Sequence, residues 1–442
     1  MRQGKAPVKP NGFGKFLCEI AAFGSQVFKV RAQLTEPTGG AQVSSILRHP
    51  PFVRFWLARI ASSLSFQMLA VAVGWRIYAL TNSAFDLGLV GLAQFVPMVL
   101  LTLLVGQVAD RYDRRLIAGI CQVLEGVAAA VLAVGTVRGF LGRDGIYVAV
   151  AVMGAARAFE SPTMAALLPD LLTRGLLERG SAWSASANQT AQIIGPALGG
   201  ALYILGPSIV FSVAAVLFLA AAVSLVRIRS ALRPRTRPAI TLRSFFAGLA
   251  FVRRHPPILG TVSLDLFAVL FGGVTALLPI FARDILMTGP WGLGLLRAAP
   301  AIGALSMSVY LGHRPLQIPT GPTMFGAVIM FGAATIMFAL STNFSLSLAS
   351  LVVLGAADVT SVVIRFSLVQ LRTPQEMRGR VSAVNALFIG TSNQLGEFES
   401  GLTAALFGTV PAAVLGGVST IVVAVLWMRL FPQLLALRSL EQ

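Results

Sequence analysis

The chain has 442 residues, of which 56% are hydrophobic and only 12% are charged, well below the charged share of an ordinary soluble domain. So few charges exclude a water-soluble globular protein of this length, because they cannot cover its surface. The formal net charge of +18 does not indicate nucleic-acid binding either, since the basic residues stand in short clusters between long apolar runs.

The dominant feature along the chain is a series of mostly apolar segments of about 20 residues or more, the length that crosses a bilayer. Residues 1–45 precede the first of them and hold only short apolar patches, so we expect a non-spanning segment there. The sequence predicts an all-α membrane protein of twelve transmembrane helices. They run over residues 54–80, 86–109, 115–137, 145–168, 181–204, 207–227, 257–282, 291–311, 320–341, 345–370, 381–405 and 409–430.

Basic residues indicate the orientation of these helices. They cluster in the loops after the second, fourth, sixth, eighth and tenth segments, whereas the opposite loops hold only Arg138, Arg143 and Arg283. Cytoplasmic loops are enriched in arginine and lysine. We therefore expect both termini, including the tail 433–442, to lie in the cytoplasm.

The chain also divides into two halves, residues 46–227 and 257–432, joined by an arginine-rich segment, 228–256, that is expected to be a solvated cytoplasmic linker. His-Pro-Pro precedes both the first and the seventh segment. Several small residues recur at a shared offset, as in Gly154 and Gly355 or Ser181 and Ser382. Two parallel six-helix repeats with a binding site between them are a transporter architecture.

The loop after the second segment reads GQVADRYDRR from Gly106 to Arg115. It resembles the cytoplasmic loop signature of the major facilitator superfamily, apart from Asp113, where that superfamily often has glycine. The alternative is an ordinary charged turn. The resemblance implies a cytoplasmic gate, in which a glycine lets two helices approach and an acid contacts a helix N-terminus or a basic partner. The gate residues are Gly106, Asp110, Arg111, Arg114 and Arg115.

Charged residues inside the segments are the candidate proton and substrate pathway, because charges at membrane depth are costly and usually functional. Arg157 and Glu160 lie in a stretch that resembles the superfamily's buried-arginine motif, about 18 Å into the fourth segment. Asp358 is the repeat equivalent of Arg157. We expect Arg157 to neutralise Glu160 and Asp358. The alternative for Arg157 and Glu160 is a structural ion pair.

Glu397 and Glu399 are two further acids, in the eleventh segment, and they point about 200° apart on a helix. Glu397 is the first candidate for a proton carrier, since no basic residue lies near it in its own segment. Glu399 has the alternative of reaching the outer interface, where it would merely be solvated.

The fifth segment ends in Gly195, Pro196, Ala197, Leu198, Gly199 and Gly200. This resembles the end of the motif that marks proton-antiport exporters in the superfamily, although alanines stand at 182 and 191 where that motif has glycines. The alternative is a generic packing kink.

No nucleotide-binding loop, metal-ligand cluster or catalytic nucleophile arrangement is apparent, so we expect neither an enzyme nor a cofactor or metal. Two cysteines, Cys18 and Cys121, imply no disulfide framework.

The resemblance extends over residues 46 to 432. The gate loop and the stretch LRTPQEMRGRVS, from Leu371 to Ser382, are most similar to the branch that contains the enterobactin exporter and macrolide-efflux proteins. This implies a monomeric transporter of the bacterial inner membrane that exports a siderophore or drug-like molecule in exchange for protons. Its partners would be the substrate, protons and the lipid bilayer. An importer or lipid flippase of the same fold, and a non-transporting sensor or scaffold, remain alternatives.

Overall fold

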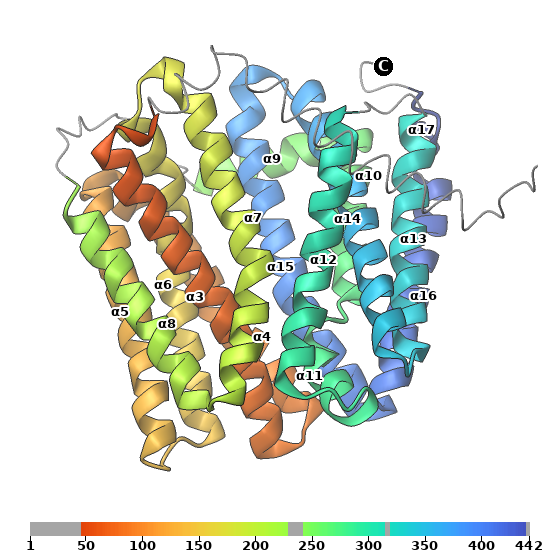
Figure 1. The fold of residues 1–442 in the computed structure, drawn as a ribbon. Helices are drawn as coiled ribbons and strands as arrows, with labels where there is room; N and C mark the ends of the chain where they lie inside the picture. The colour runs from red at the N-terminus through yellow and green to blue at the C-terminus, as the bar shows by residue number, and fades with distance from the viewer. Residues whose placement is uncertain (1–45, 229–241, 314–318, 439–442) are drawn as a thin grey trace, which may run out of the picture.

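The computed structural model describes residues 46–228, 242–313 and 319–438, and the regular structure in these ranges is helical. Long helices pack side by side into a bundle (Figure 1). Those of the first half are α3 (Pro50–Thr81), α4 (Ala84–Arg111), α5 (Arg114–Val137), α6 (Arg143–Leu171), α7 (Arg174–Ile204) and α8 (Pro207–Val226). Those of the second half are α10 (Pro256–Gly272), α12 (Gly289–His313), α13 (Thr320–Leu340), α14 (Phe344–Arg372), α15 (Gln375–Phe407) and α16 (Thr409–Leu430).

Local sequence explains where several of these helices begin and end. Proline occupies the first turn of α3, α8 and α10, where its missing N–H breaks no helical hydrogen bond. The side chain of Ser83 accepts a hydrogen bond from the Asp86 backbone at the start of α4, and Asn343 caps α14 in the same way. Asn82 ends α3 with a left-handed φ of 48°. These caps produce the short turns that hold neighbouring helices antiparallel.

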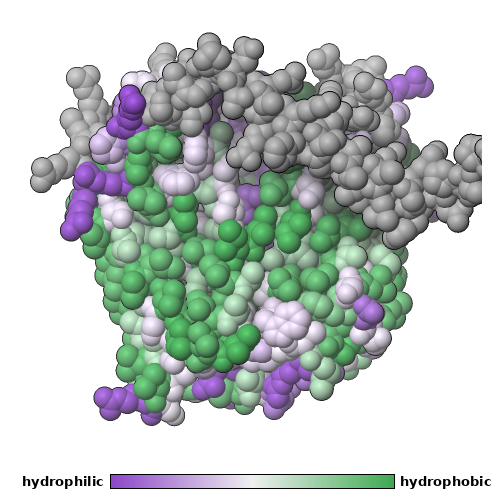
Figure 2. Space-filling view, in the orientation of Figure 1, coloured by the Kyte–Doolittle hydropathy of each residue, from purple (hydrophilic) through white to green (hydrophobic). Residues whose placement is uncertain are grey.

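The bundle has an apolar outer surface suited to lipid. Nine of the described helical segments are long and apolar enough to cross a membrane. Hydrophobic side chains cover the middle of the face drawn in Figure 2, and hydrophilic ones lie along its lower edge. Helices α6, α7 and α15 fall outside this group, because they carry many of the polar and charged residues that face the interior. A count of twelve spans therefore stays a prediction.

The seventh predicted segment, 257–282, is interrupted rather than continuous. Helix α10 ends at Gly272, and a 3₁₀ turn η1 (Thr275–Leu277), a short helix α11 (Leu278–Ile280) and a π-helical turn η2 (Phe281–Ile285) follow. The physical reasons are the glycine pair Gly272-Gly273 and Pro279, which cannot donate a backbone hydrogen bond. The stretch Pro256–Ile285 is still one candidate membrane span, but its second part is irregular, and η1 and α11 contact α4 and α3 of the other half.

Part of the segment between the halves is also helical. Helix α9 (Leu242–Arg254) packs against α15 and α10, and Val252 joins a buried apolar cluster with Ile258, Val381 and Val384. This stretch was expected to be solvated. Val252 is instead buried against the second half, with Leu249 and Phe251 packed beside it, whereas Phe246 stays exposed. A four-residue helix, α17 (Pro432–Leu435), follows α16.

The two halves meet most closely at one end of the bundle. The largest apolar cluster contains residues of both halves there, including Ile77, Leu277, Phe281 and Leu293. At the opposite end each half has an apolar cluster of its own. The packing therefore closes the bundle at the end that carries the turns at Asn82 and Gly206.

Candidate functional site

A cavity of about 410 Å³ lies between the two halves, within the size range of small-molecule sites. Its lining comes from α3, α4, α6 and α7 on one side and from α12, α14, α15 and residues 274–279 on the other. Most of the lining side chains are apolar. The polar and charged ones are Gln67, Gln94, Gln192, Thr275, Arg297, Asp358, Gln394 and Glu397. This mixture suits an amphipathic molecule.

Glu397 lines the cavity together with a cation that the sequence analysis missed. Arg297, on α12, interacts electrostatically with Glu397, on α15. Glu397 also packs tightly against α4, because a Cβ on Gly91 would lie 2.9 Å from the Cβ of Glu397. The expectation that no basic residue lies near Glu397 is true of its own helix and wrong for the folded protein. Arg297 could have been found from the sequence, because it is an arginine inside the eighth apolar segment, where a charge is costly.

Asp358 lines the cavity as well, but its cation is not Arg157. Asp358 interacts with Arg365 on its own helix and with Asp265 on α10. Arg365 and Asp265 form a buried ion pair with 2.6 Å between Nη1 and Oδ2. The expected pairing of Asp358 with Arg157 is therefore wrong. Arg157 and Asp358 occupy equivalent positions in the two repeats and so lie in different halves. Arg157 interacts with Glu160 of the first half, and Asp358 interacts with Arg365 of the second.

Arg157 and Glu160 do form the expected ion pair, with 2.8 Å between Nη1 and Oε2. The pair is absent from the cavity lining and lies behind Phe66, whose ring stacks on the Arg157 guanidinium with the centroid 4.2 Å away. The other oxygen of Glu160 accepts hydrogen bonds from Ser62 at 2.5 Å and Gln122 at 3.3 Å. Glu160 thus joins α3, α5 and α6.

Glu399 points away from the cavity. It is half-buried and accepts a hydrogen bond from Thr403, one turn later on α15, at 2.9 Å. Of the two acids in this segment, Glu397 alone lines the cavity, as their angular separation on a helix requires.

The Gly-Pro segment of α7, from Gly195 to Gly200, packs closely against α3 and α12 and also lines the cavity. A Cβ on Gly195 would lie 2.6 Å from Gln67, and one on Gly199 would lie 2.9 Å from the backbone of Met68, so both glycines seat α3. Gly200 meets α12 of the other half, since a Cβ there would lie 2.5 Å from the Pro290 carbonyl oxygen. Pro196 lines the cavity. The segment therefore joins the cavity to the contact between the halves.

The gate loop is only partly within the described side chains. Gly106, Asp110 and Arg111 lie near the end of α4, at positions where the structure describes the backbone but not the side chains. Arg114 pairs with Asp170 of α6 at 2.6 Å. Arg115 pairs with Asp113 at 2.7 Å and donates to the carbonyl oxygen of residue 228 at 2.5 Å. These contacts tie α5 to α6 and to the chain after α8.

Asp113, where the loop departs from the superfamily pattern, is the N-cap of α5. Its side chain accepts a hydrogen bond from the Arg115 backbone. The Arg115 side chain, through its hydrogen bonds, lowers the pKa of Asp113 from its ordinary value. The aspartate thus supplies a helix cap and an ion pair, neither of which glycine offers.

Polar contacts link the halves at the closed end. Tyr78 of α3 donates a hydrogen bond to Asp284 of η2, and Arg283 donates to the Asn82 side chain at 2.9 Å. Arg283 also lies over the Tyr78 ring. Deeper in the bundle, Gln189 donates to the carbonyl oxygen of Ala301 at 3.0 Å.

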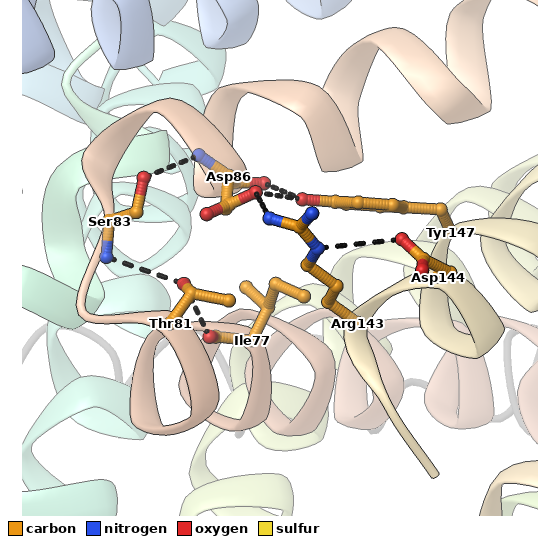
Figure 3. A network of polar contacts seen from close by, with 7 residues as sticks. All are labelled: Ile77, Thr81, Ser83, Asp86, Arg143, Asp144 and Tyr147. Atoms are coloured by element: carbon orange, nitrogen blue, oxygen red, sulfur yellow. Dashed lines mark hydrogen bonds and ion pairs between the residues drawn. The ribbon is translucent and has the colours of Figure 1, made fainter.

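A second network at this end braces the first half (Figure 3). Tyr147 donates to Asp86 at 2.6 Å, and Arg143 lies 3.9 Å from the same carboxylate. The Ser83 backbone donates to Thr81 at 3.3 Å. The turn between α3 and α4 is thereby fixed to the start of α6.

Comparison with known proteins agrees with this architecture. Residues 42–441 match the family model described as "Transmembrane secretion effector". The chain is 26% identical over 410 residues to the enterobactin exporter EntS of Citrobacter koseri, which covers 90% of this chain and 95% of that protein. It is 25% identical to EntS of Salmonella choleraesuis, covering 90% of this chain and 96% of that protein.

Solved structures share the fold at low sequence identity. An inward-facing bacterial homologue of the lysosomal transporter Spinster has a TM-score of 0.70 at 13% identity, covering 87% of this chain and 97% of that one. An inward-facing bacterial homologue of ferroportin has a TM-score of 0.68 at 19% identity, covering 88% and 99%. The nucleoside transporter NupG has a TM-score of 0.68 at 13% identity, covering 86% and 99%.

Proposed function

The chain belongs to the transmembrane secretion effector family of major facilitator transporters, and we propose that it exports a siderophore-like amphipathic molecule in exchange for protons. It is a transporter rather than an enzyme. The observation that carries the proposal is the cavity between two halves that are joined tightly at one end only. Such a site can be opened to either side in turn by rocking one half against the other.

The sequence and the relatives both favour transport out of the cell. If the arginine-rich loops are cytoplasmic, the closed end faces outward, and the cavity is in a state ready to load cargo from the cytoplasm. The relatives described as enterobactin exporters match along nearly their whole length. The Gly-Pro segment of α7, which resembles the exporter motif, lies between the cavity and the closed end. We place the transporter in a bacterial inner membrane, acting as a monomer.

The cavity chemistry supports an amphipathic cargo that carries hydrogen-bonding groups. Apolar walls surround three glutamines from the first half and Gln394 from the second. Arg297 adds a basic group, and Glu397 and Asp358 add two acidic ones. A molecule with aromatic or aliphatic surface and several polar groups would use both parts of the lining. The relatives are described as enterobactin exporters, so enterobactin is the test cargo for this proposal.

Proton coupling is assigned to Glu397. A carboxylate that gains a proton no longer attracts Arg297, so proton binding frees the cation for cargo or for helix movement. Binding of a proton and binding of cargo then affect each other, which is what coupling means thermodynamically.

The test uses purified protein in proteoliposomes with enterobactin as cargo and an imposed pH gradient. Glu397→Gln should reduce gradient-driven transport at least tenfold, while exchange of enterobactin at equilibrium continues. Glu399→Gln is the matched control, because it changes an acid on the same helix outside the lining, and it should transport normally. Gradient-driven transport by Glu397→Gln at the wild-type rate would move the assignment to Asp358.

A further inference from the structure

One carboxylic acid is buried deep in the first half and does not line the cavity. Glu125, on α5, has an exposed fraction of 0%. Neither of its carboxylate oxygens has a hydrogen-bond partner among the described residues. Helix α8, which packs along α5, contains no titratable side chain in Pro207–Val226. A charge on Glu125 would therefore be buried without a direct partner, which is strongly disfavoured.

The charged groups around Glu125 come from α3 and α6. Glu160 and Arg157 act on it electrostatically from α6. Arg59 of α3 acts in turn on both of those residues. Cys121, one turn earlier on α5, is a further titratable neighbour. Ser62, Gln122 and Arg157 all donate to Glu160, so its two oxygens have donors, whereas those of Glu125 have none among the described residues.

The available hydrogen-bond donors and acceptors favour the protonated form of Glu125. Gln122 lies three residues earlier on the same face of α5, and its side-chain oxygen is also buried without a donor among the described residues. An ionised Glu125 would add two more acceptors and no donor. A protonated carboxyl group supplies one O–H donor, in a place where two buried side chains lack one. One proton therefore removes the buried charge and adds a donor beside orphaned acceptors.

The same group of residues is connected to the cavity wall. Phe66 lines the cavity, and the Arg157 guanidinium stacks on its ring. Ser62, one turn earlier on α3, donates to Glu160. Cargo that displaces Phe66 would alter the position of Arg157, and with it the electrostatic effect of Arg157 on Glu125.

We propose that Glu125 is a proton-binding site of this transporter, separate from the central cavity and linked to it through Phe66 and Arg157. The inference rests on the proposed function, because it places a second proton within a proton-coupled cycle. It differs from that proposal in location, since Glu397 lies in the second half and in the cavity wall.

Infrared spectroscopy of the purified full-length protein in lipid nanodiscs tests proton occupancy without any cargo. A protonated carboxylic acid absorbs apart from a carboxylate. At neutral pH, Glu125→Gln should lose one protonated-carboxyl band relative to the wild type, whereas Glu160→Gln should lose none. Retention of every such band in Glu125→Gln would overturn the proposal, whatever the transport activity.

Two further measurements test the link to the cavity and to transport. Phe66→Ala should shift the pH at which the Glu125 band disappears, whereas Phe85→Ala, a phenylalanine change near the start of α4, should not. In proteoliposomes, Glu125→Gln should lose gradient-driven enterobactin transport at least tenfold and keep exchange. An unshifted titration, or gradient-driven transport at the wild-type rate, would make Glu125 a structural acid only. A wild-type protein that moves no enterobactin would contradict the proposed cargo, whereas the protonated-carboxyl band of Glu125 would still be present.

Discussion

Two ion pairs inside the bundle each join opposite charges of the same half. Arg157 pairs with Glu160 in the first half, and Arg365 pairs with Asp265 in the second. In a low-dielectric interior such pairing offsets the cost of removing ions from water, and breaking one partner leaves an uncompensated charge. The second pair joins α14 to α10, whereas the first lies within α6, and the charges in the cavity wall remain available to cargo and protons.

Loss of one member of the second pair should destabilise the protein measurably. Arg365→Gln leaves Asp265 buried without its cation, and we expect a loss of about 3–5 kcal/mol, seen as a lower melting temperature in detergent. Adding Asp265→Asn should restore part of this loss. Arg143→Gln is the control, because that side chain is 60% exposed and such pairs contribute about 0–1 kcal/mol. A double variant no more stable than Arg365→Gln alone would contradict the importance of this ion pair.

At the scale of helices, the contact between α7 and α12 is set by glycine. Cβ atoms on Gly200 and on Gly294 would each lie 2.5 Å from a backbone carbonyl oxygen of the facing helix. Only residues without side chains allow this approach, so the two helices can meet at the closed end and separate in another state. The break after α10 adds the turn η2, whose Arg283 and Asp284 contact α3 at the same end.

Substitution of this glycine should shift the conformational equilibrium. Gly200→Ala should open the end now closed, because the added methyl group cannot fit against Pro290. In a cysteine-free background carrying Gln192→Cys, an impermeant thiol reagent applied from the side opposite the arginine-rich loops should then label the cavity faster. Gly326→Ala is the control, since nothing lies within 4 Å of its added Cβ. Equal labelling in both variants would show that the close approach at Gly200 does not hold this end shut.

For the whole molecule, orientation in the membrane follows from the distribution of arginine. Along the sequence, the basic residues gather after every second apolar segment, including the stretch 228–256, and loops rich in arginine and lysine are typical of the cytoplasmic side. We propose on this basis that the closed end is external and that the present conformation is the one that receives cargo from inside the cell.

Cysteine labelling of intact cells tests this orientation. In a cysteine-free background, Thr236→Cys should resist an impermeant thiol reagent until the cells are opened. Asp144→Cys, at an exposed position in the first turn of α6 at the other end, should label at once and serves as the control. Immediate labelling at position 236 would reverse the topology and, with it, the direction in which the cavity faces.

The membrane class, the helical architecture, the two-half fold and the family could all be predicted from the amino-acid sequence, because they depend on local hydrophobic length, loop charge and short motifs. Local sequence also indicated Glu397, as an acid inside an apolar segment, and the Gly-Pro segment of α7, as a partial motif; the roles given to them stay predictions. The pairing of the charges became known only from the folded protein. Arg297 reaches Glu397 from another helix, Asp358 lies with Arg365 and Asp265, and Glu125 has no hydrogen-bond partner among the described residues. Such pairings depend on helix rotation and on packing between segments distant in sequence, and periodicity within one segment does not specify them.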